Sequence, residues 1–512
     1  MSNTKNQPFI RLGIIVGTIL LALLIGRLIG PEAYEWITTF LKAVGLVLLG
    51  ITLLVTIHEL GHFLTAKWFG MRVEAFSIGF PPKLFSVTRG ETDYQIGATP
   101  LGGYVKISGI IDESMDTQHI EEEPQPWEFR AKPVWQRLIV MTGGVIMNVL
   151  LGIFIFSMLK FAFGERFTPM EELQNGVAVR KTVKTENKCG DIVEKTTLGY
   201  YLGFRTGDKL VSYKGESFPY FEDYNTPALL IEEDAYFEVD RNGERVRIDV
   251  PPKVLDKFNN DSIEVYLFSM RNYPSQILLS KDDTSGIVKD DIVRPADKAG
   301  LRSGDVITQI NDTPIRYYED LLNTIPELAN QQVAVTASRA DSLMNFTVSL
   351  DSTSKMGILP YPDAIVDVNS EIQKYGFFSS FPKGLESAFN VLSLNAKGFG
   401  QIIQGNASAG NSVMGPLAIA KVYLDRFLQY GWGGFWELTA SLSMILAFVN
   451  ILPIPALDGG HVVFLLIEAI TRKEPSTKIR IIAQQIGMFI LLGLMVLVIF
   501  NDFFTHLLGT CA

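Results

Sequence analysis

The feature that most constrains the fold is an apolar run that continues almost unbroken from Phe40 to Ile57. A stretch of this length predicts a helix that crosses a membrane. Further apolar runs cover residues 12–30, 138–163, 435–470 and 481–500. Charged residues make up 20% of the chain, although the mean hydropathy is positive at +0.20. This combination predicts membrane spans joined to water-exposed domains, and 512 residues exceed one ordinary domain.

The first of these runs leads into a His-Glu-x-x-His pattern, formed by His58, Glu59 and His62. On a helix the two histidines lie one turn apart on the same face with the glutamate beside them, as in a zinc site with a built-in general base. Ionisable side chains are costly at membrane depth and therefore mark functional sites. Histidines satisfied by neighbouring backbone are the less favoured interpretation. Catalytic zinc takes three protein ligands, so one more ligand must come from elsewhere.

A second polar interruption lies far downstream, between Asn450 and His461. It contains Pro453 and Pro455, which remove helical hydrogen bonds, and the carboxylate Asp458. Asp458 and His461 are both candidates for the third ligand. Backbone freed by the two prolines could bind a substrate together with the Asn450 amide, although the same residues could simply kink a helix.

Between residues 166 and 363 the hydrophobicity falls and one pattern occurs twice. Gly203-Phe-Arg-Thr-Gly-Asp208 is repeated as Gly300-Leu-Arg-Ser-Gly-Asp305, which indicates two copies of one unit. The second copy, with Pro295-Ala296 before it, resembles a PDZ domain closely, whereas the first copy lacks that lead-in.

Together these motifs resemble the site-2 protease family of intramembrane zinc metalloproteases, and within it the bacterial regulator-of-sigma-E type with tandem PDZ domains. The resemblance covers nearly the whole chain. It implies that His58, His62 and Asp458 bind Zn²⁺, that Glu59 is the general base, and that His461 does not bind the metal. The implied activity is regulated intramembrane proteolysis of single-span membrane proteins, such as anti-sigma factors or remnant signal peptides.

The predicted fold is a polytopic α-helical membrane protein with four core transmembrane helices and an extra N-terminal one. Two inserted α+β PDZ-like domains and a membrane-associated β-hairpin region complete it. The expected segments are an N-terminal anchor (1–35), the HExxH helix (36–70), a cytoplasmic β-rich region (71–137), a transmembrane helix (138–165), PDZ-like domains (166–253 and 254–363), an amphipathic helical linker (364–434), the transmembrane segment with Asp458 (435–470) and a C-terminal transmembrane helix (471–512).

Three of these segments carry further expectations. Residues 71–109 alternate as strands do, and in relatives the matching region forms a small sheet near the active site whose open edge could hold an extended substrate; an ordinary hairpin is the alternative. Residues 375–403 predict an amphipathic helix, either on the membrane surface or packed on the PDZ-like pair. In residues 138–163, Gly143 and Gly144 predict close helix packing, and Asn148 predicts a bond to a neighbouring helix.

Basic residues predict the orientation. Arg472, Lys473, Lys478 and Arg480 crowd one short loop, and further lysines and arginines follow His62. By the positive-inside rule both loops are cytoplasmic, so the PDZ-like pair is periplasmic and the zinc lies near the cytoplasmic face of a bacterial inner membrane, in contact with lipids.

Several other functions fit the sequence less well. A net charge of −10 argues against nucleic acid as a partner. The two cysteines, Cys189 and Cys511, imply no disulfide framework. A metal-ion transporter would explain the histidines and Asp458, and a scaffold would explain the PDZ-like pair. Neither has a use for Glu59 at its position.

Overall fold

The computed structural model describes residues 7–110, 123–186, 192–251, 254, 263–264, 266–271, 274–279, 294–350, 355–360, 371–405 and 415–503. The chain divides into two compact units. The first contains residues 1–164, 374–396 and 413–510, and the second contains residues 165–373, 397–412 and 511–512. Cys189, Cys511 and most of the acidic segment before Glu123 lie outside the described residues.

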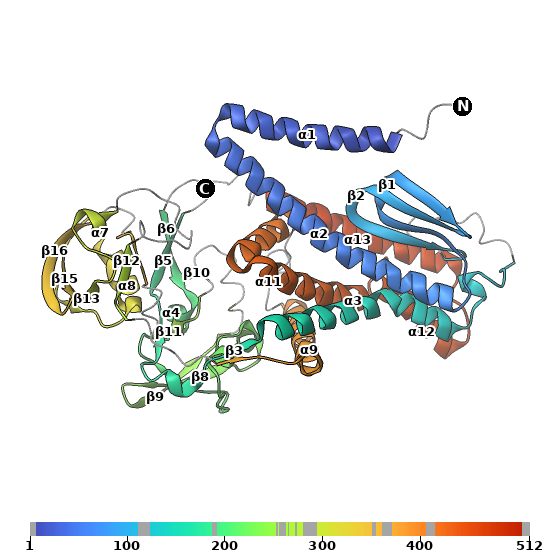
Figure 1. Ribbon diagram of the computed structural model, residues 1–512. Helices are drawn as coiled ribbons and strands as arrows, with labels where there is room; N and C mark the ends of the chain where they lie inside the picture. Colours follow the sequence, from blue (N-terminus) through green and yellow to red (C-terminus); the bar gives the residue numbers. More distant parts are fainter. Residues whose placement is uncertain are drawn as a thin grey trace. The chain divides into compact units, whose positions relative to one another are not determined.

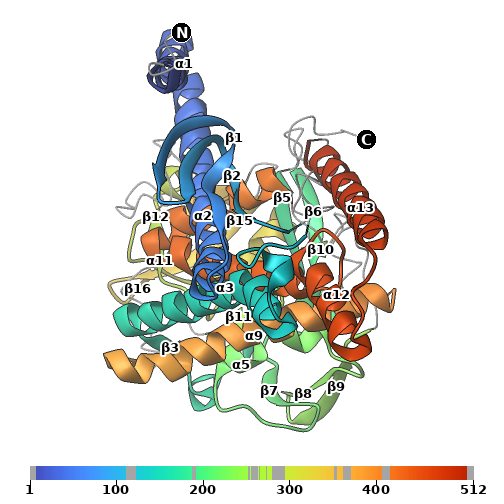
Figure 2. The same ribbon diagram turned by 90° about the vertical axis from the view of Figure 1, so that its right-hand side faces the viewer.

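The first unit is mainly helical (Figures 1 and 2). Its helices are α1 (Gln7–Ile29), α2 (Pro31–Trp68), α3 (Val134–Phe163), α9 (Phe377–Ile403, of which the last residues belong to the second unit), α11 (Pro416–Ile451), α12 (Asp458–Thr471) and α13 (Thr477–Phe503). Among the described residues, α2, α3, α11 and α13 are long and apolar enough to cross a membrane. These four helices fit the predicted polytopic α-helical membrane protein.

The N-terminal helix α1 is separate from α2 and folds back beside it (Figure 1). The two helices meet where Gly26 lies against Ile37. Among the described residues, α1 contains the apolar helical stretch Leu20–Ile29. A fifth span in this region stays a prediction.

The segment predicted as one broken span, residues 435–470, consists of two helices with six non-helical residues between them. Helix α11 starts earlier, at Pro416, and ends at Ile451, while α12 starts at Asp458. A further break lies at Gly431, where φ is 59° and ψ is −144°; the glycines at residues 431–434 are typical of a turn, and the sequence therefore predicted the span to start only at residue 435. Across this break, the Tyr423 hydroxyl lies 3.1 Å from the Thr439 hydroxyl, so the two parts of α11 pack on each other.

Helices α2 and α3 touch through backbone. A Cβ atom at Gly61 would lie 2.2 Å from the Gly143 carbonyl oxygen, and one at Gly143 would lie 2.8 Å from the Gly61 carbonyl oxygen. Small residues permit such close approach of helices in membranes. The glycines therefore bring the α3 backbone directly behind the histidine face of α2.

The predicted β-rich region forms a sheet from two long, bent strands, β1 (Val73–Arg89) and β2 (Thr92–Ile107). Ile78 in β1 pairs with both Ile96 and Gly103, so the first part of β1 lies between the two parts of β2. Residues 103–107 consequently form an edge, whose outer side pairs with no strand in the described part of the chain. The sheet lies along α2 (Figure 1), where the Thr52 hydroxyl donates to the Pro100 carbonyl at 2.9 Å.

Helix α9 matches the predicted amphipathic helix. Its small buried residues, Ser380, Gly384 and Ala388, form the inner face, and a Cβ atom at Gly384 would lie 2.1 Å from the Ser157 hydroxyl of α3. Phe378 stays 85% exposed. Within the first unit, α9 therefore packs on α3 and leaves aromatic side chains on its outer side.

The second unit is built from short strands and helices. Its first half contains β3 (Glu165–Phe167), β4 (Val177–Ala178), β5 (Thr182–Glu186), β6 (Ile192–Thr197), α4 (Leu198–Leu202), β7 (Lys209–Tyr213), α5 (Phe221–Tyr224), β8 (Tyr236–Arg241), β9 (Glu244–Asp249), β10 (Ile263–Glu264) and β11 (Ser269–Met270). Its second half contains β12 (Ile277–Leu279), α7 (Pro295–Lys298), β13 (Val306–Ile310), β14 (Thr313–Pro314), α8 (Tyr318–Thr324), β15 (Gln332–Arg339), β16 (Ser342–Ser349), β17 (Ile358–Pro360) and β18 (Glu371–Gln373).

The repeated sequence pattern corresponds to a repeated contact. Buried Asp208 accepts hydrogen bonds from Arg241 at 2.7 and 2.8 Å, and buried Asp305 accepts them from Arg339 at 2.7 and 2.7 Å. The Asp208 carboxylate also holds the pKa of Arg241 above its ordinary value. Each half has its own apolar core. The duplication inferred from the sequence is thus present in the structure.

Candidate active site

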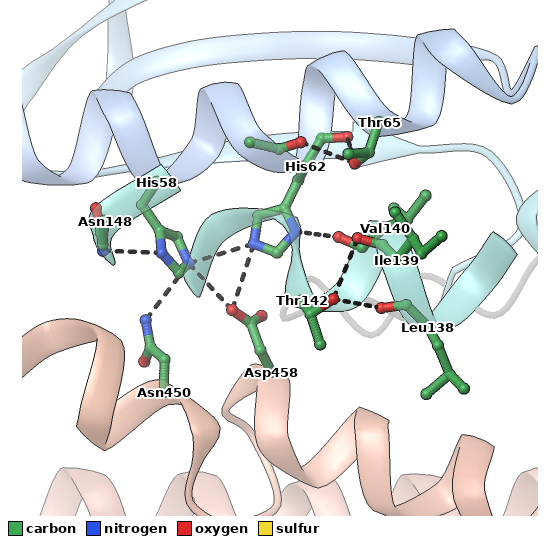
Figure 3. Close-up of polar contacts among 11 residues, drawn as sticks. His58, His62, Thr65, Leu138, Ile139, Val140, Thr142, Asn148, Asn450 and Asp458 are labelled. Carbon is green, nitrogen blue, oxygen red and sulfur yellow. Dashed lines mark hydrogen bonds and ion pairs between the residues drawn. The ribbon is translucent and has the colours of Figure 1, made fainter. Parts of the chain in front are cut away.

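Three side chains from two distant helices converge in the first unit (Figure 3). His58 and His62 are buried on α2, and Asp458 is the first residue of α12. Asp458 Oδ2 lies 3.1 Å from His58 Nε2 and 3.3 Å from His62 Nε2, and the two Nε2 atoms are 3.2 Å apart. Of the described histidine, cysteine and acidic residues, these three form the one group that could hold a metal ion.

These distances fit a tetrahedral metal site. Zinc–nitrogen and zinc–oxygen bonds of about 2.0–2.1 Å place neighbouring ligands about 3.3–3.4 Å apart. The protonation pattern agrees, because His62 Nδ1 lies 2.8 Å from the Val140 carbonyl oxygen, which can only accept. A neutral His62 ring then carries its proton on Nδ1 and directs the Nε2 lone pair toward Asp458. The two Nε2 lone pairs and the Asp458 carboxylate oxygen would repel one another, so a cation between them would stabilise the arrangement, since a buried carboxylate needs a partner.

Helix α3 supports both histidines from behind. The Asn148 side-chain amide nitrogen lies 3.2 Å from His58 Nδ1, and the Val140 carbonyl oxygen lies 2.8 Å from His62 Nδ1. Between them, a Cβ atom at Gly144 would lie 2.5 Å from atoms of both rings, so only glycine leaves them room. The sequence predicted close packing here and an Asn148 bond to a neighbouring helix, but no contact with the histidines. The four-residue spacing of Gly144 and Asn148 was the available signal for this face of α3.

Glu59 lies between the histidines and the sheet. The Val105 backbone interacts with its carboxyl group, and a Cβ atom at Gly103 would lie 3.4 Å from Glu59 Cγ. Both contacts come from the edge part of β2. Glu59 is therefore placed where an extended chain added to that edge would meet the metal-binding group.

A cavity of about 660 Å³ surrounds these residues. It is lined by the two histidines, Glu59, Asp458, residues 102–107 of β2 and several apolar side chains. His461 also lines it, although it does not belong to the convergent group.

Of the three described residues predicted to bind substrate, Asn450 lines the cavity and the two prolines do not. Asn450 lines the cavity, and its Nδ2 lies 3.4 Å from His58 Nε2. Pro453 and Pro455 are not among the described residues that line it. Pro455 instead meets α13, where a Cβ atom at Gly487 would lie 1.8 Å from the Pro455 carbonyl oxygen. The prolines end α11, and the chain then turns back to place Asp458 opposite the histidines.

The family of the chain follows from comparison with known proteins. The model of Peptidase family M50 matches residues 46–494, which include both motifs and everything between them. The chain belongs to peptidase family M50, the site-2 protease family. This M50 protein is a zinc metalloendopeptidase, and its apolar helices fit a multi-pass protein of the bacterial inner membrane.

Curated relatives can be aligned with this chain along almost their full length. A putative zinc metalloprotease of Vibrio cholerae is 28% identical over 469 residues, which cover 89% of this chain and 97% of the relative. One of Neisseria meningitidis is 27% identical over 478 residues, covering 90% and 98%. The regulator of sigma-E protease RseP of Salmonella typhimurium is 26% identical over 471 residues, covering 89% and 97%.

Proposed function

We propose that this M50 protease cleaves single-span membrane proteins inside the membrane, with His58, His62 and Asp458 as its zinc ligands and Glu59 as its general base. The observation that carries the proposal is the convergence of two Nε2 atoms and one carboxylate oxygen, 3.1–3.3 Å apart, in a cavity bounded by an open strand edge. Bound there, Zn²⁺ would polarise the scissile carbonyl group and acidify the attacking water.

Glu59 performs the proton transfers. Its carboxylate lies beside the metal-binding group, so it can take a proton from the attacking water and deliver it to the leaving amine. Glu59 and Val105 both line the cavity, so the carboxyl group is on the cavity side of α2.

The substrate is held as an extended strand. A helical peptide bond hides its carbonyl group, so a transmembrane segment must unwind before it can be cut. The outer edge of β2 at residues 103–107 offers backbone groups for strand addition next to Glu59. Asn450 also lines the cavity and supplies a donor and an acceptor.

The substrate class and the membrane arrangement are part of the same proposal. The Salmonella relative is named a regulator of sigma-E protease, which favours anti-sigma-factor-like substrates or remnant signal peptides. The two halves of the second unit form two PDZ-like domains on the periplasmic side, supported by the duplicated Asp–Arg pair, by their separate apolar cores and by the basic loops. Val254, Ile263 and Phe268 belong to the first core, so the boundary between the two domains lies after β11 and not at residue 253 as the sequence predicted. The zinc site then lies near the cytoplasmic face.

Glu59→Gln tests the proposal in purified, reconstituted protein. Zinc content and cleavage of a single-span reporter are measured together with substrate binding. The variant should keep equimolar zinc, retain bound substrate and lose cleavage, because only the base is removed. Cleavage at the wild-type rate would reject Glu59 as the base. Zinc transport into vesicles with no cleavage by the wild type would instead indicate a transporter.

A further inference from the structure

The Nδ1 atoms of the two histidines, which face away from the metal position, contact different kinds of group on α3. His62 Nδ1 meets the Val140 carbonyl oxygen, a backbone acceptor, at 2.8 Å. His58 Nδ1 meets the side chain of Asn148 at 3.2 Å, with the amide nitrogen drawn toward the ring (Figure 3). Asn148 is 0% exposed, and its Oδ1 has no hydrogen-bond partner among the described residues. A fully buried amide at membrane depth requires a compensating interaction.

The chemistry of a metal-binding imidazole decides which end of the amide faces the ring. When His58 Nε2 directs its lone pair toward the metal position, its Nδ1 carries the proton and must donate. The NH₂ group of Asn148 is also a donor, so two donors would face each other. Rotation of the amide by half a turn exchanges nitrogen and oxygen with almost no change in shape. The contact then becomes an Nδ1–H···Oδ1 hydrogen bond.

We propose that Asn148 is a positioning residue that accepts the Nδ1 proton of His58 through its Oδ1 and thereby directs the Nε2 lone pair of His58 toward the metal. The proposal rests on the proposed zinc site. After this rotation of the amide, the NH₂ group of Asn148 has no partner among the described residues. The stabilisation of the His58 ring in its metal-binding orientation therefore comes from the Oδ1 bond alone. Val140, Gly144 and Asn148 then act as one stripe of α3 that provides an acceptor for each ring and space between them.

The proposal predicts that the acceptor at position 148 matters, and not its polarity or volume alone. Asn148→Asp keeps an oxygen toward His58 Nδ1, whereas Asn148→Leu keeps the approximate volume and removes every acceptor. Partners of metal-bound histidines typically contribute about 10–100-fold to metal affinity. A matched control is Ser157→Ala, which removes another buried polar side chain of α3. The Ser157 hydroxyl donates to the Ile153 carbonyl oxygen at a distance of 2.7 Å, and it has no hydrogen bond to the metal-binding residues in the described part of the chain.

The experiment measures the zinc affinity of full-length, metal-free protein in detergent by competition with a chelator. Asn148→Leu should lose about 10–100-fold in zinc affinity, while Asn148→Asp and Ser157→Ala should stay within a few-fold of wild type. Asn148→Ala replaces the leucine variant if that one does not fold, with the same loss expected. Wild-type affinity in the Leu or Ala variant, or an equal loss in Asn148→Asp, would overturn the proposal. Unchanged zinc affinity in His58→Ala would instead overturn the proposed zinc site itself, so the two failures are distinguishable.

Discussion

Gly61, the residue between Leu60 and His62, should not tolerate even a methyl group. Its added Cβ would lie 2.2 Å from the Gly143 carbonyl oxygen and 2.8 Å from the Gly144 nitrogen. Ordinary contact begins at 3.4 Å, so α2 and α3 must separate locally by about 1.2 Å. The obstructing atoms are backbone, which cannot rotate away as a side chain can. Overpacking of this kind typically costs about 1–3 kcal/mol.

The same separation acts on the metal site. It would stretch the bond of 2.8 Å between His62 Nδ1 and the Val140 carbonyl oxygen beyond hydrogen-bond distance. We therefore expect Gly61→Ala to lower both the melting temperature and the zinc affinity, the latter by about 10–100-fold.

A control on the same helix makes the comparison sharp. Gly45 has nothing within 4 Å of its added Cβ, so Gly45→Ala changes the same helix without a clash. Its stability should stay equal or rise slightly, because alanine is the better helix former. Thermal unfolding and chelator competition are measured for both variants in one detergent. Equal melting temperatures and zinc affinities in the two variants would refute the close contact of α2 with α3.

Three further predictions concern α11, α12 and their partners. Asp458→Asn should lower zinc content and abolish cleavage, whereas His461→Ala should keep zinc and substantial cleavage; the reverse result in a zinc assay would reassign the third ligand. Asn450→Ala should reduce cleavage while melting temperature and zinc content stay near wild type, and parallel losses in all three would indicate a packing role. Arg137→Ala should lower stability by more than about 1 kcal/mol, because it leaves the partly buried Glu468 carboxylate without the partner that now lies 2.5 Å away. Denaturant unfolding checks this last value, and a change below about 1 kcal/mol would contradict it.

The sequence predicted the elements that have a strong local signal. The four-residue spacing of His58 and His62 predicted that both rings lie on one helix face, as they do. The alternation of apolar and polar residues in 71–109 predicted strands, which the structure contains. The repeat around Asp208 and Asp305 predicted the duplication, and each aspartate forms the same pair with an arginine in the structure.

What the sequence did not predict depends on tertiary contact. Val140 supports His62 through its backbone carbonyl group, which every residue type carries, so no side-chain pattern marks it. The start of α11 at Pro416 was missed because the glycines at residues 431–434 favour a turn, and the helix resumes after the local break at Gly431. Pro453 and Pro455 were correctly expected to interrupt the helix. Their sequence position could not indicate that Pro455 packs on α13 while Asn450 faces the cavity.

The most direct test of the account is X-ray absorption at the zinc edge on the purified wild-type protein. A zinc site made of His58, His62 and Asp458 should show two imidazole nitrogens at about 2.0–2.1 Å and oxygen ligands at about 2.0–2.2 Å, with no sulfur. The same spectrum from Asp458→Asn should change in its oxygen shell, because Asp458 supplies one of those atoms. A third imidazole in the wild-type spectrum, which His461 could supply, or a spectrum unchanged by Asp458→Asn, would contradict a site made of His58, His62 and Asp458.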